Sequence, residues 1–272
     1  MDGGRYMTKQ KYDEFYFKGD KNYSSEVYWE LYNKDKIKAI EKYHGNIFCP
    51  ICKKAPLTVV NGNTRRYFKV SSSDMDKHEA DCSYRHIQAS SREIESFYKD
   101  LDNSKIRSRL VSCMNLMLKK IKLGECVDNS EKEKNKHSMG NEFLTIKTKE
   151  GKYKRLPEKN ILQKFKEEDF GIQKIFYGKC MIEKKIINTK SGSRFCKLKL
   201  INENRKAICN IDISNVAFSY MENKIEELKD DGEYYICFSS CISQNYFVID
   251  SRQIPYKECK IYDSRLIIIE SV

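Results

Sequence analysis

The chain has 272 residues and a formal net charge of +12, with 40% hydrophobic and 33% charged residues. This composition is too apolar for a disordered protein and too charged for a membrane protein. No run of 18 apolar residues occurs, and the first 15 residues lack the apolar segment of a signal peptide. We therefore expect a cytoplasmic protein with no membrane partner.

Eleven cysteines are present, which is a high and odd number. The cytoplasm keeps thiols reduced, so the count does not predict a disulfide framework. Several cysteines lie within apolar strand patterns, where a free thiol behaves as a small hydrophobic side chain. Most of them are expected to be core residues.

The N-terminal half is predicted to be rich in α-helix. The apolar spacing predicts a helix over residues 26–43, and Ser90 with Glu93 forms a capping-box pattern that begins another helix. A third helix is expected over 105–123. Residues 127–141 are polar, charged and without periodicity, so they are predicted to link a domain at 1–126 to one at 142–272.

The strongest motif is Cys49-x-x-Cys52, followed after 25 residues by His78-x-x-x-Cys82. A Cys-x-x-Cys turn brings two thiolates to one point, and positions i and i+4 of a helix share one face. The segment between the pairs reads as a β-hairpin. The pattern predicts a ββα module around a structural Zn²⁺ ion, resembling the Cys-Cys-His-Cys zinc fingers in ligand order.

The histidine ligand has an alternative. His78, Cys82 and His86 follow one another at four-residue intervals, so Cys82-x-x-x-His86 also fits helical geometry. His86 could then replace His78 or Cys82. We favour His78 with Cys82 because both lie nearer the expected start of the helix.

Two basic segments are candidates for nucleic-acid binding. The second strand of the hairpin mixes cations with an aromatic residue, which suits phosphate contact and base stacking, although a solvated strand edge explains it equally well. Its candidates are Arg65, Arg66, Tyr67 and Lys69. The second segment, 103–124, has no acidic residue, and we expect contacts from Lys105, Arg109, Lys119 and Lys120.

The C-terminal half reads as strands, with one helical stretch near residues 217–228. Three strands, a helix and two strands over residues 172–256 resemble the OB-fold, a five-stranded barrel. Alternation predicts Cys196, Leu198 and Leu200 inside and Phe195, Lys197 and Lys199 outside. The resemblance implies an oligonucleotide surface on the outside of strands two and three, with contacts from Phe195, Lys197, Lys199 and Lys206.

Signs of catalysis are few, since the chain has four histidines and no phosphate-binding glycine motif. The sequence predicts an α+β protein, with an α-rich half that contains a ββα zinc module, followed by an OB-like five-stranded β-barrel. Its expected function is non-enzymatic binding of single-stranded DNA or RNA. The alternatives are a protein-interaction adaptor with structural zinc and a metal-dependent nuclease that uses acids such as Asp74 and Asp76.

Overall fold

The structure is a computed structural model that describes residues 11–62, 66–80, 82–125, 144–148, 150–190, 192–230, 232–249 and 251–272. Two compact units divide the chain: unit 1 is Met1–Ala89 with Lys134–Arg155, and unit 2 is Ser90–Glu133 with Leu156–Val272. The boundaries of these units differ from those of the expected domains, because Ser90–Glu133 groups with unit 2 and Lys134–Arg155 with unit 1. The expected linker 127–141 lies outside the described residues. No described helix is long and apolar enough to cross a membrane.

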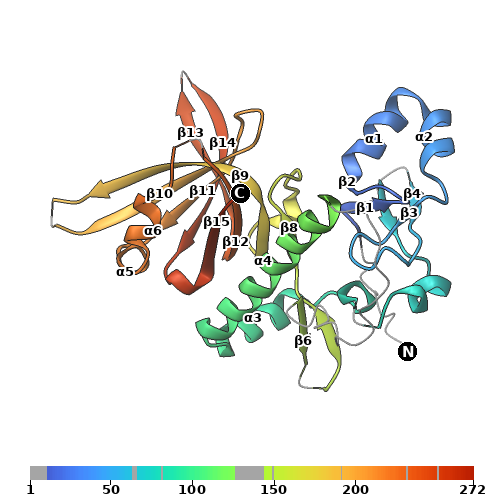
Figure 1. The fold of residues 1–272 in the computed structure, drawn as a ribbon, viewed down its shortest axis with the longest axis horizontal. Coiled ribbons are helices and arrows are strands. Elements are labelled where there is room, and N and C mark those ends of the chain that lie inside the picture. The colour runs from blue at the N-terminus through green and yellow to red at the C-terminus, as the bar shows by residue number, and fades with distance from the viewer. Residues whose placement is uncertain are drawn as a thin grey trace. The chain divides into compact units, whose positions relative to one another are not determined.

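Unit 1 is a mixture of short strands and short helices (Figure 1). A three-stranded sheet of order β2-β1-β3 and two hairpins, β4-β5 and β6-β7, supply its strands. The helices that have described bounds in this unit are two α-helices and two 3₁₀-helices. In chain order the elements are β1 (Glu14–Phe17), β2 (Asn22–Ser24), α1 (Ser25–Lys34), α2 (Lys36–Tyr43), β3 (Ile47–Phe48), β4 (Thr58–Asn61), β5 (Arg66–Lys69), η1 (Ser72–Lys77), η2 (Ser83–Arg85), β6 (Thr145–Lys147) and β7 (Tyr153–Arg155).

The prediction of an α-rich N-terminal half is wrong, for two local reasons. The helix expected over 26–43 is interrupted at Asp35, whose backbone is extended and whose carboxylate accepts a hydrogen bond from the Lys38 amide as the cap of α2. The helix expected to carry His78 and Cys82 is absent as well. The 3₁₀-helix η1 ends before His78, and η2 begins after Cys82.

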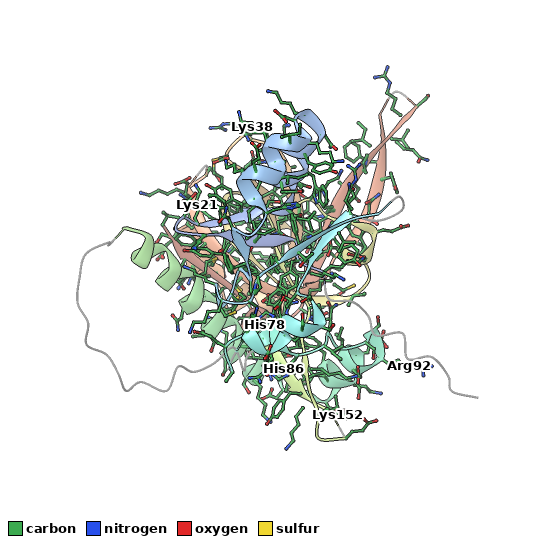
Figure 2. The ribbon with its side chains drawn as sticks, turned by 90° about the vertical axis from the view of Figure 1, so that its right-hand side faces the viewer. Lys21, Lys38, His78, His86, Arg92 and Lys152 are labelled. Carbon is green, nitrogen blue, oxygen red and sulfur yellow. The ribbon has the colours of Figure 1, made fainter. Side chains whose placement is uncertain are left out.

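Aromatic side chains form much of the core of unit 1. Phe15, Tyr28 and Phe68 are fully buried, and Tyr28 and Phe15 both meet the Phe68 ring edge-on at 5.3 and 5.5 Å between ring centres. Edge-to-face pairs of this kind add to the stability gained from burial alone. Exposed lysines such as Lys21, Lys38 and Lys152 lie at the periphery of this unit (Figure 2).

Unit 2 is built on one eight-stranded, mostly antiparallel sheet with the strand path β13-β14-β11-β10-β9-β12-β15, to which β8 adds by pairing with β9. The sequence predicted one helical stretch near residues 217–228; the structure has two short helices there, between β11 and β12. Its elements are α3 (Ser91–Asp100), α4 (Asn103–Glu125), β8 (Glu158–Asn160), η4 (Glu167–Asp169), β9 (Gln173–Asn188), β10 (Arg194–Ile201), β11 (Ala207–Ile213), α5 (Asn215–Ser219), α6 (Glu222–Glu226), β12 (Glu233–Cys241), β13 (Ser243–Ile249), β14 (Arg252–Ile261), η5 (Ser264–Leu266) and β15 (Ile267–Ser271).

The predicted five-stranded barrel is not closed among the described residues. The strand order includes an antiparallel run β9-β10-β11, a parallel pair β11-β14 and an antiparallel pair β12-β9. Closure needs a ladder between β12 and β14. Instead, β15 pairs with β12 and β13 pairs with β14, so the edges that would meet are partly occupied.

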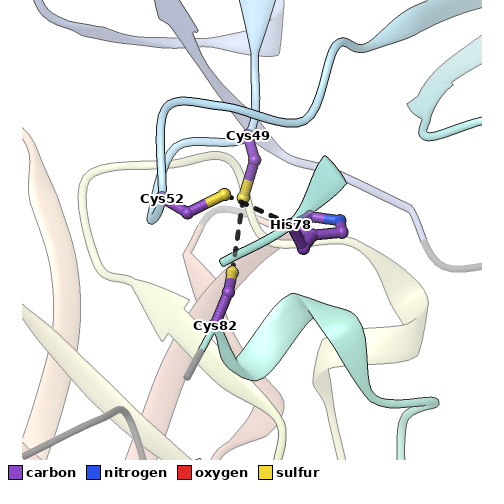
Figure 3. A group of neighbouring side chains, drawn as sticks. All are labelled: Cys49, Cys52, His78 and Cys82. Atoms are coloured by element: carbon purple, nitrogen blue, oxygen red, sulfur yellow. Dashed lines mark hydrogen bonds between the residues drawn. The ribbon is translucent and has the colours of Figure 1, made fainter. Parts of the chain in front are cut away.

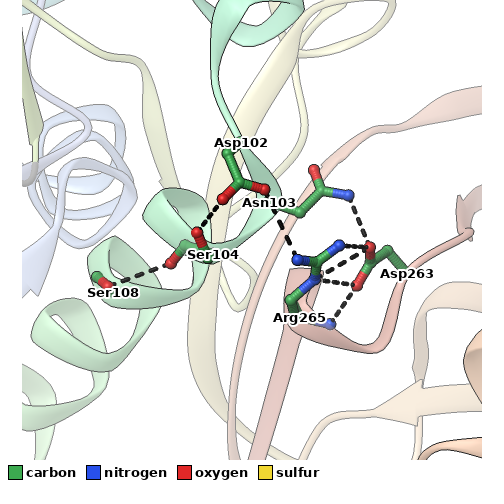
Figure 4. A network of polar contacts seen from close by, with 6 residues as sticks. All are labelled: Asp102, Asn103, Ser104, Ser108, Asp263 and Arg265. Carbon is green, nitrogen blue, oxygen red and sulfur yellow. Dashed lines mark hydrogen bonds and ion pairs between the residues drawn. The ribbon is translucent and has the colours of Figure 1, made fainter.

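Helices α3 and α4 are fixed to unit 2 by packing and by capping. The capping box at Ser90 and Glu93 is confirmed, since the Ser90 amide donates to the Glu93 carboxylate at 2.8 Å. At the start of α4, the side-chain amide of Asn103 donates to the Asp263 carboxylate at 2.7 Å. The same carboxylate also accepts a hydrogen bond from the Arg265 guanidinium (Figure 4). The basic helix is thus anchored at its first turn to the segment before β15.

Asp169 carries a buried charge network in unit 2. Its carboxylate lies 3.1 Å from the Lys159 ammonium and 2.6 Å from that of Lys174, and all three side chains are almost fully buried. Burial alone would raise the pKa of Asp169, but the two lysines outweigh it and hold that pKa below its usual value. This cluster joins the 3₁₀-helix η4 to strands β8 and β9.

Replacing Asp169 with Asn should lower the free energy of unfolding by about 3–5 kcal/mol, because two buried ammonium groups lose their counter-charge. Urea denaturation measures the change. Glu167→Gln removes the same charge from an exposed neighbour and should cost less than about 0.5 kcal/mol. Equal losses in the two variants would contradict the assignment.

The Asp169 variant should also change how stability depends on pH. Since the folded-state pKa is depressed, the ion pairs contribute fully above the unfolded value of about 4 and are lost as pH falls through the lower folded value. The difference between the wild type and Asp169→Asn should therefore shrink below about pH 4. A constant difference across acid denaturation curves would argue against the ionised carboxylate.

Candidate metal centre and nucleic-acid interface

The four predicted ligands lie together in unit 1. Cys49 and Cys52 lie in the turn after β3, where the Lys53 amide donates to the Cys49 carbonyl at 2.9 Å and Lys53 takes a positive φ of 59°. His78 follows η1 and Cys82 precedes η2, both with extended backbone. Figure 3 shows the four side chains converging on one point.

The geometry of this cluster fits a tetrahedral metal ion. The sulfurs of Cys49 and Cys82 are 3.8 Å apart, the sulfur of Cys52 lies 3.4 Å from Nδ1 of His78, and all four donor atoms fall within 4.8 Å of one another. A tetrahedral zinc site has corresponding edges of about 3.8 Å between sulfurs and about 3.5 Å between sulfur and nitrogen. The four residues are buried, which leaves no side for solvent.

The histidine is oriented by a second partner. Nε2 of His78 lies 3.2 Å from the hydroxyl of Tyr12, while Nδ1 faces the sulfurs. Tyr12 is buried, stacks on Tyr84 at 4.5 Å between ring centres, and donates its amide to the Phe68 carbonyl. Metal-bound histidines commonly use the second ring nitrogen in this way, since it fixes the tautomer and the ring direction.

The pKa values of the three cysteine thiols also favour binding of a cation. Hydrogen bonds from Cys49 and Cys82 lower the pKa of Cys52, burial raises the pKa of Cys49 to about 12, and the hydrogen bonds to Cys49 and Cys52 raise the pKa of Cys82. Without a cation, burial and the mutual proximity of the three sulfurs oppose deprotonation of Cys49 and Cys82. A divalent cation relieves their mutual repulsion, so that all three can bind as thiolates. The donor set is compatible with a metal such as zinc, held by four protein ligands.

His86 lies outside this cluster. Its ring contacts Tyr153 at 5.9 Å between ring centres, and the backbone from Cys82 to His86 is a 3₁₀ turn rather than an α-helix. Positions four residues apart share one face only in an α-helix, so the spacing does not direct His86 to the same point as Cys82. Asp74 is also engaged locally, since it pairs with Lys77 at 2.7 Å and accepts from Ser71.

The basic candidates of the β4-β5 hairpin are only partly available. Arg65 lies outside the described residues. Arg66 is exposed, but its guanidinium lies over the rings of Trp29 and Tyr32 and donates to Asn33 at 2.9 Å. The other two candidates, Tyr67 and Lys69, are half-buried.

The candidates on α4 are likewise dispersed. Lys105 is exposed, whereas the Arg109 guanidinium lies over Phe97 at 4.9 Å from the ring centre. Lys119 and Lys120 are on α4, but their side chains lie outside the described part of the structure. Arg107, another cation of this helix, donates to the Ile267 carbonyl and so connects the helix to β15.

The outward face of β10 matches the predicted alternation. Cys196, Leu198 and Leu200 are fully buried, while Lys197 and Lys199 are exposed and Phe195 is half-buried. On β11 the inward assignment holds for Cys209, Ile211 and Ile213. The same alternation predicts Ala207 inside and Ile208 outside, and this is wrong: Ala207 is exposed and Ile208 is buried, because the pairing with β10 shifts between Leu200 and Ile201.

The two outward lysines of β10 are paired with carboxylates. Lys197 lies 3.1 Å from Asp212 on β11, and Lys199 lies 2.9 Å from Glu183 on β9. Lys206, in the turn before β11, is exposed. Exposed ion pairs of this kind are weak and exchange readily with a competing anion. The lysines therefore remain usable as phosphate contacts, but they do not form an uncompensated positive stripe.

Strand register extends this face beyond the residues that the sequence identified. Asn210 pairs with Glu258 on β14, so Tyr256 and Ile254, two and four residues earlier, lie on the same face. Their partners on β13 are Asn245 and Phe247. We call this continuous surface, from Phe195 across β11 to Phe247, the outward face.

Aromatic residues lie at its far end, which projects as the β13-β14 hairpin (Figure 1). Phe247 is 42% exposed and its ring lies 5.7 Å from that of Tyr256. A separate open cavity of about 460 Å³ is lined by Asn245, Glu258 and Lys260 and by Ser240 of β12, and neither Phe247 nor Tyr256 lines it. Local sequence predicts a strand at β13 but not its exposure, which depends on the position of the strand in the sheet.

Substitution of a cluster residue should remove the metal. We expect Cys52→Ser and His78→Ala to reduce metal bound per chain from about one to near zero, since three ligands hold zinc far less tightly than four. Mass spectrometry with inductively coupled plasma measures the content. Cys241→Ser, a half-exposed thiol outside the cluster, and His86→Ala are matched controls that should keep the metal. Loss in His86→Ala with retention in His78→Ala would reverse the ligand assignment.

Sequence comparisons identify no relative, because no protein-family profile and no curated protein sequence matches the chain. Among solved structures, the chain is similar to one described as a Plasmodium falciparum SSB complex with ssDNA. The match covers 36% of this chain and 93% of that chain, with 7% sequence identity and a TM-score of 0.26. That TM-score is too low to show a shared fold.

Proposed function

We propose that the protein binds single-stranded DNA or RNA on the outward face of unit 2. The observation that carries this proposal is the aromatic pair of the exposed Phe247 and the half-buried Tyr256, which strand register aligns on the same face as Phe195 and the lysines of β10. Aromatic platforms joined by cations suit a flexible strand, because bases stack on the rings while phosphates meet the cations.

The charge of the outward face supports a polyanionic ligand with few phosphate contacts. Five cations lie on it against three carboxylates. The cations are Lys185, Lys197, Lys199, Arg252 and Lys260, and the carboxylates are Glu183, Asp212 and Glu258. Stacking would therefore supply a large share of the affinity, and the salt dependence should be moderate.

The strand order is consistent with an OB-like arrangement. The helices fall between the third and fourth strands, and the β13-β14 hairpin forms within the connection from β12 to the strand that pairs parallel with β11. In OB-folds the surface of strands two and three and the loop between strands four and five hold oligonucleotides. Fold alone does not select a ligand, so the exposed aromatic residues remain the deciding feature.

In this proposal the Cys3His cluster of unit 1 holds a structural Zn²⁺. Thiolates with imidazole are the donors that favour zinc over hard cations, and four protein ligands leave no position for a reactive water. The ion would join the Cys49–Cys52 turn to the segment 78–82. Its role is to stabilise unit 1.

Fluorescence anisotropy with labelled single-stranded DNA, single-stranded RNA and duplex tests the proposal. We expect single strands to be preferred, with a slope of log affinity against log salt of about −2, as for roughly three phosphate contacts. Phe247→Ala and Phe195→Ala should each weaken binding by about 5- to 150-fold, the effect of losing one stacked base.

Tyr220→Ala is the matched control, because this tyrosine is 80% exposed near α5 and lies off the outward face. Its affinity should equal that of the wild type. If metal-loaded protein fails to bind single strands even at low salt, the proposal is wrong. Equal losses in all three variants would place the binding surface elsewhere.

A further inference from the structure

Strand β13 is the terminal strand of the sheet. It pairs with β14 along Ser243–Ile249, and no strand in the described part of the chain pairs with its other edge. Its sequence, SQNYFVI, contains neither a charged residue nor a proline. Natural edge strands are commonly protected from pairing by lysine, proline or a bulge. None of these interrupts β13.

The middle of this strand is also apolar and exposed. Tyr246, Phe247 and Val248 are 55%, 42% and 67% exposed. The other large apolar residues that are exposed in the described chain occur singly along the sequence. Isolated exposed apolar residues are ordinary, whereas a run of them on an open strand edge marks an interaction site.

We propose that β13 pairs with β13 of a second copy of this chain, forming a two-fold dimer through a continuous antiparallel sheet. Charge favours a second copy as the occupant. Two chains of net charge +12 repel each other over most of their surfaces, but a strand without charge can approach its own copy without placing like charges opposite each other.

The strand is self-complementary in length and pattern. Its seven residues are centred on Tyr246, so full-length antiparallel pairing places Tyr246 opposite Tyr246 of the second copy. Asn245 then faces Phe247, and Gln244 faces Val248. Such an isologous interface is closed, which gives a dimer rather than a fibre.

This dimer would join two candidate binding faces. The two-fold axis of an antiparallel strand pair is perpendicular to the sheet, so the outward faces of both copies lie on the same side. The consequence rests on the proposed function: one single strand could contact both faces, and its second contact would be intramolecular. Long oligonucleotides should therefore gain affinity from dimerisation, whereas short ones should not.

Sedimentation velocity of the full, metal-loaded chain tests the dimer without any nucleic acid. We expect the wild type at micromolar concentration to sediment as a dimer and Val248→Lys to sediment as a monomer, because the substitution puts a charged lysine on each copy of a strand edge that otherwise carries no charge. Val216→Lys is the matched control, since Val216 is 59% exposed on α5 and should leave the dimer intact. A monomeric wild type, or a dimer that persists in Val248→Lys, overturns the proposal.

The register has its own test. Tyr246→Cys should form a covalent dimer with oxidised glutathione, since directly opposed residues of antiparallel strands have Cα atoms about 4.5–5.5 Å apart, within disulfide range. Tyr220→Cys and the wild type report the background from other cysteines and should stay monomeric on a non-reducing gel. Equal cross-linking of both variants contradicts the proposed register.

Binding data separate this inference from the proposed function. Val248 lies on the opposite side of the hairpin from Phe247. Val248→Lys should therefore bind a short single strand as the wild type does and lose affinity only for long ones. A dimer that binds no single strand would overturn the function and leave the interface standing.

Discussion

Side-chain alternation along the paired strands of unit 2 is the constraint on which the core and the candidate interface both depend. In β10, Leu198 belongs to the core and Lys197 to the outward face, and their neighbours in β11 and β14 follow the same division. A slip of one residue would exchange these sets, burying lysines and exposing leucines. The cost of that exchange fixes the register, and the register in turn aligns Phe195, Lys199 and Tyr256 on one surface.

A different constraint operates in unit 1, where four donor atoms must meet at a single point. The sequence separates Cys52 from His78 by 25 residues, and the β4-β5 hairpin spans that interval. Tyr12 ties the site to the aromatic core, because the same residue contacts His78 through its hydroxyl and Phe68 through its backbone. A metal ion bound by this cluster would therefore be coupled to the packing of the core, and its removal would destabilise more than the four ligand residues.

The features that local sequence could predict are those set by spacing and alternation. The Cys49, Cys52, His78 and Cys82 cluster, the capping box at Ser90 and the buried row of β10 all follow from such patterns. The errors arose where tertiary structure decides. The four-residue spacing of His78 and Cys82 suggested an α-helix, but extended backbone at His78 brings its imidazole to the sulfurs. The predicted barrel does not close because β15 pairs with β12 and β13 pairs with β14, where a β12-β14 ladder would be needed. The sequence of a single strand does not show which partner it will take.

The pairing of Lys197 with Asp212 and of Lys199 with Glu183 shows why counting cations along one strand overstates a binding surface. Both acids lie on other strands, so only the register brings them beside the lysines. The apolar surface of Phe247 is not covered in this way, since the ring stays partly exposed to water even though it packs near Tyr256. Exposed aromatic area that the monomer leaves uncovered is a stronger indication of a ligand than charge that the monomer already balances. In the proposed binding of single strands, that difference assigns the larger share of the binding energy to the β13-β14 hairpin rather than to the lysines of β10.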